Sequence, residues 1–163
     1  MKKKIILSII SIVLLLGFTT GCDKELIEEK QRNEIIRTLE NENLIDDSWS
    51  YVDLVIEEGS PLGGIKSYNY VYKDINNNYY IVSMGTTLIY KEDIKRNNIN
   101  VKANTTYYYV KIGKGEYEVT TETRGKYKYT NKTAEIDNTK EISYYLIHYE
   151  DEKAIVEEEI HDS

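Results

Sequence analysis

The chain has 163 residues, with 21 lysine and arginine residues against 28 aspartate and glutamate residues, and its formal net charge is −7 at pH 7. An acidic chain repels phosphate backbones, so the charge argues against nucleic-acid binding. The single cysteine leaves no partner for an internal disulfide bond.

The first 21 residues have the three-part layout of a secretory signal peptide. Lys2, Lys3 and Lys4 form a basic start, an apolar run follows at residues 5–16, and small residues come next. This apolar run is shorter than the roughly 20 residues that a membrane-spanning helix needs. An exported protein is therefore expected.

The sole cysteine closes this segment, in the sequence Phe18-Thr19-Thr20-Gly21-Cys22. The sequence resembles the lipobox of bacterial lipoproteins, although Thr19 replaces the leucine usual in that family. The resemblance implies that a signal peptidase recognises Thr19, Thr20 and Gly21 and cuts before Cys22, which then carries a diacylglyceryl group. Two acyl chains are enough for stable anchoring to a membrane. The alternatives are an ordinary cleaved signal peptide with an incidental cysteine and an uncleaved N-terminal anchor.

The mature chain expected after cleavage at Cys22 has 142 residues, enough for one domain. It carries 18 basic and 28 acidic residues, because the leader holds three lysines and no acid. Residues 22–45 are expected to form a lipid-linked tether and a helix. A helix is predicted over about residues 24–43, with only residues 35–44 docked on the domain, from the spacing of Ile27, Ile35, Ile36, Leu39 and Leu44. A solvated tether with one docked turn is the alternative.

From Trp49 onward the apolar residues alternate as they do in strands, so residues 46–163 are expected to form an antiparallel β-rich domain. Turns are predicted at residues 74–78, 114–115, 124–125 and 150–153, and one helical turn within residues 91–98. Residues 58–64 hold the only proline and three glycines, and they are a candidate binding loop. About eight strands are predicted; the first begins at Trp49, and the others cover residues 65–73, 79–90, 99–112, 116–123, 126–133, 141–149 and 154–160.

This order of elements predicts an α+β fold, with one N-terminal helix followed by a mostly antiparallel β meander. A curved sheet with the helix on its concave face is expected. The cystatin-like fold has this arrangement, but no motif links the chain to it, so the similarity is an analogy. A small β-barrel or β-sandwich is the alternative.

Tyrosine dominates the aromatic residues, with 16 tyrosines against one phenylalanine, Phe18. Tyrosine combines a large apolar ring with a hydroxyl, which suits recognition of proteins or sugars. One hypothesis is an aromatic sheet surface that binds a partner; the alternative is packing across strands. The candidate surface consists of Tyr68, Tyr70, Tyr72, Tyr107, Tyr109, Tyr127 and Tyr129.

Residues that point to catalysis or metal binding are scarce. Asp74-Ile75-Asn76-Asn77-Asn78 begins like a calcium loop but lacks the required later glycine and glutamate, so it is interpreted as a hairpin turn. His148 and His161 are the only histidines, and His148 is expected to be half-buried and hydrogen-bonded. No catalytic residue, metal site or cofactor is predicted.

The sequence therefore favours a non-catalytic, lipid-anchored binding protein on the extracytoplasmic side of the cell membrane. Its expected partners are the membrane, through the lipid on Cys22, and an unidentified envelope protein or glycan. One alternative is an immunity or exclusion lipoprotein directed against a toxin, phage or plasmid. Another is a small envelope hydrolase, which requires His148 to line an open cleft beside a carboxylate.

Overall fold

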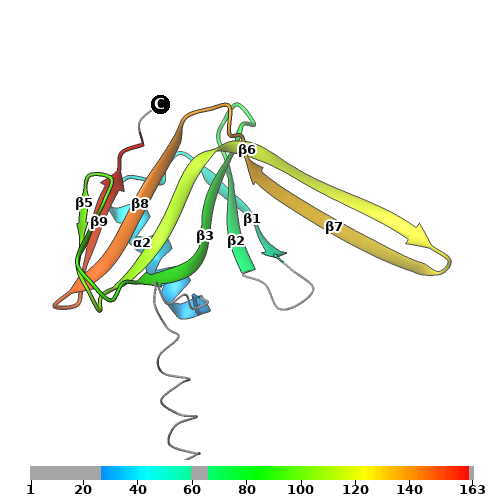
Figure 1. The fold of residues 1–163 in the computed structure, drawn as a ribbon. Coiled ribbons are helices and arrows are strands. Elements are labelled where there is room, and N and C mark those ends of the chain that lie inside the picture. Colours follow the sequence, from blue (N-terminus) through cyan, green and yellow to red (C-terminus); the bar gives the residue numbers. More distant parts are fainter. Residues whose placement is uncertain (1–26, 60–65, 162–163) are drawn as a thin grey trace, which may run out of the picture.

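The computed structural model describes residues 27–59 and 66–161. In these residues one helix, α2 (Glu29–Asn41), precedes nine strands. The main sheet is antiparallel with the strand order β1-β2-β3-β6-β8-β9, while β7 pairs with β6 and β4 pairs with β5 (Figure 1). The strands are β1 (Ser50–Glu58), β2 (Lys66–Lys73), β3 (Tyr79–Ile89), β4 (Ile94–Arg96), β5 (Ile99–Val101), β6 (Thr106–Arg124), β7 (Tyr127–Ile136), β8 (Ile142–Glu150) and β9 (Lys153–Glu159).

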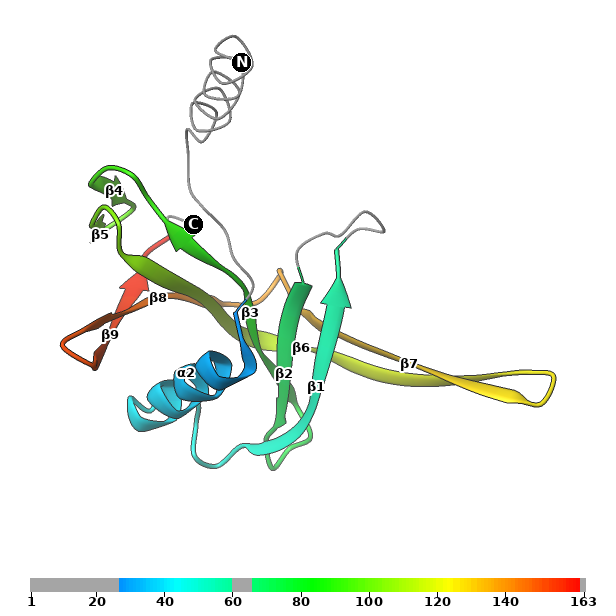
Figure 2. The same cartoon turned by 90° about the horizontal axis from the view of Figure 1, so that it is seen from below.

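This architecture confirms the predicted α+β class with a curved antiparallel meander, and the sheet does not close into a barrel. The sheet bends around α2, which lies on its concave side (Figure 2). Within residues 27–59 and 66–161, no helix has the length and apolar character needed to cross a bilayer.

The face of the sheet under α2, called the helix face, carries the larger core. Period-two alternation along each strand sends every second side chain to this face. Tyrosines supply the aromatic rings of this core. The buried residues of this core are Ile27, Ile35, Leu39, Ile45, Tyr68, Tyr70, Tyr72, Val82, Met84, Tyr108, Val110, Ile112, Tyr145 and Ile147.

Docking of the helix begins earlier than predicted, because Ile27 and Arg32 are both buried as well as Ile35 and Leu39. The guanidinium of Arg32 stacks 3.8 Å from the ring centroid of Tyr68. It also donates hydrogen bonds to the main-chain oxygen of Ile27 (2.6 Å) and to the hydroxyl of Tyr70 (3.3 Å). A hydropathy pattern counts arginine as polar, so it misses an arginine that packs flat on an aromatic ring.

The opposite face, called the back face, carries two smaller cores. One lies under the β4–β5 hairpin and contains Leu88, Ile99, Val101, Tyr107 and Leu146. The other contains Val55, Val71, Ile81 and Ala134, so the end of β7 covers β1, β2 and β3. The β4–β5 hairpin and the end of β7 therefore shield apolar residues on the face of the sheet that α2 does not cover.

The prediction of a turn at residues 114–115 is wrong, because β6 runs without a break from Thr106 to Arg124. At Gly115 the strand pairs with Tyr79 of β3 on one side and with Ile136 of β7 on the other. A Cβ atom on Gly115 would collide with the carbonyl oxygen of Glu135 and lie 2.7 Å from Cγ1 of Ile81. The glycine is thus used for close packing rather than for a chain reversal.

The helical turn predicted within residues 91–98 is also wrong, because β4 and β5 form a hairpin there. Asn97 has φ +50°, a left-handed conformation that asparagine tolerates better than most residues. The hairpin is fastened to β9 by Arg96 and Asn97, which donate to the buried carboxylate of Glu159 at 2.8 and 2.6 Å. This long-range contact is invisible in the local sequence pattern.

Substitution of Gly115 by alanine is expected to lower the free energy of unfolding by about 3 kcal/mol, because the new methyl group meets main-chain atoms that cannot rotate away. Urea denaturation of the two proteins measures the difference. Lys114→Ala, at an exposed neighbouring position of β6, serves as the control and is expected to change stability little. Equal midpoints for Gly115→Ala and the wild type would contradict the close packing.

Arg32→Ala is expected to lower the free energy of unfolding by about 2–3 kcal/mol, since it removes the stack on Tyr68 and leaves the Ile27 carbonyl without its donor. Arg37→Ala is the matched control, because Arg37 is exposed on the same helix. Thermal denaturation of both variants separates the loss of the Arg32 contacts from the loss of an arginine in the helix. If both variants lose the same stability, Arg32 contributes to folding only through its helix propensity, as the exposed Arg37 does.

Candidate functional site

The strands β6 and β7 continue beyond the sheet as a two-stranded projection, called here the arm and defined as residues 118–133. All sixteen of these residues are exposed. Figure 1 shows the arm extending away from the body on the side opposite β9. An isolated two-stranded hairpin is at best marginally stable in water. The arm therefore leaves the outer edges of both its strands unpaired and its side chains open to solvent.

The tip of the arm confirms the hairpin predicted at residues 124–125. Arg124 pairs with Tyr127, which leaves Gly125 and Lys126 as a two-residue loop. Gly125 has φ +63° at the first loop position, where a type II′ turn places glycine. This turn matches the natural twist of the strands, so the arm keeps its register to the tip.

The root of the arm is held against β1 by a small polar cluster. Tyr117 donates a hydrogen bond to the carboxylate of Asp53 at 2.8 Å, and Lys132 forms an ion pair with the same carboxylate at 2.6 Å. The hydrogen bond from Lys132, helped by those from Tyr117 and the Leu54 amide, holds the pKa of Asp53 below its usual value. The cluster fixes the direction in which the arm leaves the body.

The arm is basic although the chain as a whole is acidic. It holds four cationic residues (Arg124, Lys126, Lys128 and Lys132) against two acidic ones (Glu118 and Glu122), and so has a net charge of +2 within a chain of −7. Tyr127 and Tyr129 are 59% and 54% exposed. The Lys126 ammonium lies 5.6 Å from the Tyr127 ring, and the Arg124 guanidinium lies 5.8 Å from the Tyr129 ring. Exposed tyrosine and arginine are residues that protein interfaces favour.

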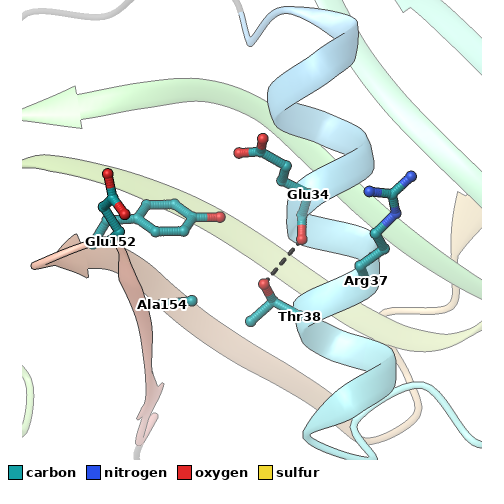
Figure 3. Close-up of a pocket in the computed structure, with 6 residues that line it drawn as sticks. Glu34, Arg37, Thr38, Glu152 and Ala154 are labelled. Atoms are coloured by element: carbon teal, nitrogen blue, oxygen red, sulfur yellow. Dashed lines mark hydrogen bonds between the residues drawn. The ribbon is translucent and has the colours of Figure 1, made fainter.

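A cleft of 680 Å³ lies between α2 and the β8–β9 hairpin, lined by Glu34, Arg37, Thr38, Tyr149, Glu152 and Ala154. Glu34 points from the helix toward the side of the cleft where Glu152 lies, whereas Arg37 points away from it (Figure 3). Burial and the nearby Glu34 charge raise the pKa of Tyr149, despite an opposing hydrogen bond to Thr38. The cleft thus presents two carboxylates and an aromatic ring, a combination that suits a cationic side chain.

The turn that carries Glu152 is positioned by its backbone. Asp151 and Glu152 both have positive φ values, of 47° and 63°, between the paired residues Glu150 and Lys153. Positive φ at both central residues is the type I′ hairpin geometry. The turn predicted at residues 150–153 is therefore confirmed, although neither of its central residues is the glycine that this turn type favours.

The seven tyrosines of the candidate surface do not lie together. Tyr68, Tyr70 and Tyr72 are buried beneath α2, whereas Tyr107 lies in the back-face core and Tyr109 packs beside it. Only Tyr127 and Tyr129 share an exposed surface, on the arm. The alternation identifies residues on one side of a strand, but it does not show which side the helix covers.

His148 is more buried than expected, at 4% exposed. Its Nε2 lies 3.2 Å from Glu150 and its ring centroid lies 5.0 Å from that of Tyr107. Its Nδ1 has no hydrogen-bond partner and lies 3.7 Å from a carboxylate oxygen of Glu157. The hydrolase alternative requires an open cleft at His148, and a ring so enclosed does not supply one.

Residues 74–78 form the predicted turn. The carboxylate of Asp74 accepts hydrogen bonds from the main-chain amides of Asn76 and Asn78 and from the Asn78 side chain, all within 2.9 Å. The hydrogen bonds from Asn78 hold the pKa of Asp74 below its usual value. The carboxylate of Asp74 is therefore used for hydrogen bonds that hold the hairpin turn.

Other predicted site residues lie outside the part of the chain that the structure describes: Thr19, Thr20, Gly21, Cys22 and residues 60–64 of the candidate loop. Within residues 27–59 and 66–161, no group of three or more histidine, cysteine, aspartate or glutamate side chains is arranged so that it could hold a metal ion. No family model matches the chain, and neither a curated protein nor a solved structure was found to be similar to it.

The Asp53 cluster predicts a pH dependence of stability. Because the folded pKa of Asp53 is lowered, its contribution is complete above the unfolded value of about 3.9 and is lost as the pH falls through the folded value. Asp53→Asn is expected to cost about 1 kcal/mol at pH 7, and this difference should shrink below about pH 4.

Urea titrations of Asp53→Asn and the wild type at pH 7 and pH 3 measure the difference in their free energies of unfolding. Glu118→Gln, on the exposed arm, is the control and should match the wild type at both pH values. A cost of Asp53→Asn that stays the same at pH 3 would show that the charge of Asp53 does not hold the arm.

Proposed function

We propose that the protein is a non-catalytic interaction protein of the bacterial cell envelope, anchored by a lipid on Cys22, with the arm as its binding element. The observation that carries the proposal is the arm itself: sixteen consecutive exposed residues, projecting from a well-packed domain. Beyond the contact of Lys132 with Asp53 at its root, the arm packs little against its own chain, so a bound partner accounts for its extension.

The position of Ile27 limits how far from the membrane an anchored domain could lie. Ile27 is 1% exposed and belongs to the core of the helix face. It lies five residues after Cys22, a stretch that spans at most about 17 Å when fully extended. A lipid on Cys22 would hold the domain close to the membrane surface, where the arm meets neighbouring envelope proteins.

An immunity or exclusion lipoprotein is a narrower form of this proposal, in which the partner of the arm is a foreign protein. The same crosslinking experiment identifies either kind of partner.

A photo-crosslinking amino acid at Tyr129 is expected to capture a specific envelope partner in living cells, because this side chain lies exposed on the arm. The control places the same group at Ile75, which is 92% exposed at the β2–β3 turn. Mass spectrometry of the crosslinked bands identifies the partner. Identical band patterns from both positions would refute the arm as the binding element.

The anchor is tested by replacing Cys22 with alanine. The wild type is expected to lose residues 1–21, to gain a diacylglyceryl mass and to remain with membranes after cell fractionation. The Cys22→Ala protein is expected to lack the lipid and to leave the membrane fraction unless its leader stays attached. Release of the wild-type protein without lipid would overturn the anchoring proposal.

A further inference from the structure

We propose that the arm tip of one molecule docks in the cleft between α2 and the β8–β9 hairpin of a second copy of the chain. The tip is residues 124–129, and the cleft is the one that Glu34, Tyr149 and Glu152 line. This inference rests on the proposed role of the arm as the binding element, and it names the partner.

Charge complementarity is the first argument. The tip presents the ammonium groups of Lys126 and Lys128 and no acidic residue, whereas the cleft presents the carboxylates of Glu34 and Glu152. Arg124, also at the tip, is already paired with Glu122 of its own strand at 3.0 Å. Neither carboxylate forms an ion pair with the residues that the structure describes. Because the arm is the basic part of an acidic chain, the body of another copy is a surface of opposite sign.

The chemistry of the cleft is the second argument. Tyr149 is 36% exposed, so part of its ring is open to an incoming side chain. A lysine ammonium over this ring, flanked by Glu34 and Glu152, would gain both a cation–π contact and ion pairs. The volume of 680 Å³ falls within the roughly 300–1,000 Å³ of ordinary ligand clefts.

The shape of the molecule requires the contact to be intermolecular. In both views the arm extends from one side of the body, while α2, β8 and β9 lie on the other (Figures 1 and 2). The arm of one molecule therefore points away from its own cleft. Reciprocal docking gives a closed dimer, and one-way docking gives an open chain of molecules.

Charge reversal tests the proposal in the full mature protein, purified from membranes in detergent as two differently tagged copies. The arm-reversed variant is Lys126→Glu with Lys128→Glu, and the cleft-reversed variant is Glu34→Lys with Glu152→Lys. Lys95→Glu with Glu92→Lys changes exposed residues elsewhere and is the control. The readout is capture of the second tagged copy by a photo-crosslinking group at Tyr127.

Each reversed variant alone is expected to lose about tenfold or more of the capture, because like charges then face each other. A mixture of the two reversed variants is expected to recover it, since the acidic arm of one then meets the basic cleft of the other. The control variant should behave as the wild type. Thermal midpoints equal to that of the wild type show that the variants are folded.

Three outcomes would overturn the second-copy proposal: no capture between wild-type copies, no effect of cleft reversal, or no recovery in the mixture. If arm reversal nevertheless abolishes crosslinks to another envelope protein, the proposed function stands and the partner is that protein. If arm reversal alone weakens binding to vesicles of anionic lipid, the tip contacts lipid headgroups instead. If arm reversal changes no contact at all, both proposals fail.

Discussion

The close packing at Gly115 is the constraint on which both parts of the molecule depend. Strand β6 pairs with β8 as far as Gly113 and with β7 from Gly115 onward, so one strand belongs to the body and to the arm. A Cβ on Gly113 would lie 2.9 Å from Cγ2 of Ile136, and one on Gly115 would collide with Glu135. The change of partner is possible because neither residue carries a side chain.

The tyrosine-rich core sets a second requirement, because each buried hydroxyl needs a polar neighbour. Tyr70 accepts from Arg32, Tyr107 accepts from the main-chain amide of Lys102, and Tyr117 donates to Asp53. Two of these contacts join elements that are distant in the sequence, namely α2 with β2 and β6 with β1. The core therefore specifies its arrangement by hydrogen bonds as well as by apolar packing.

Alternation of side chains is enough to predict the α+β class and most of the strands, because period two is a local property of the sequence. It does not find β4, and it joins β5 and the start of β6 into one strand at residues 99–112. It failed where tertiary contacts decide. From the sequence alone, Gly115 is predicted to be a turn residue, but in the structure it is a closely packed strand residue. Arg32 is likewise predicted to lie on the surface, but it stacks on the ring of Tyr68. The same pattern cannot decide between a tyrosine surface that binds and tyrosines that pack, because it does not show which face of the sheet a helix covers.

The candidate site was predicted in part. The hairpin at Gly125 and the exposure of Tyr127 and Tyr129 follow from residue type and turn chemistry. The cleft does not, because Glu34 and Glu152 are more than a hundred residues apart and meet only when α2 crosses the sheet. A cluster of basic residues at positions 124–128 is visible in the sequence, and it is the one signal that points to the arm as a separate surface.

The exposure of the arm has a consequence for how the protein can change over generations. Because residues 118–133 contact little of the body, substitutions on the outward faces of the arm cost little folding stability. Binding preference can then drift without passing through poorly folded variants. Substitutions of Gly115 or Arg32, in contrast, are expected to cost folding stability. The molecule thus has a body in which many substitutions would cost stability and an arm in which most would not.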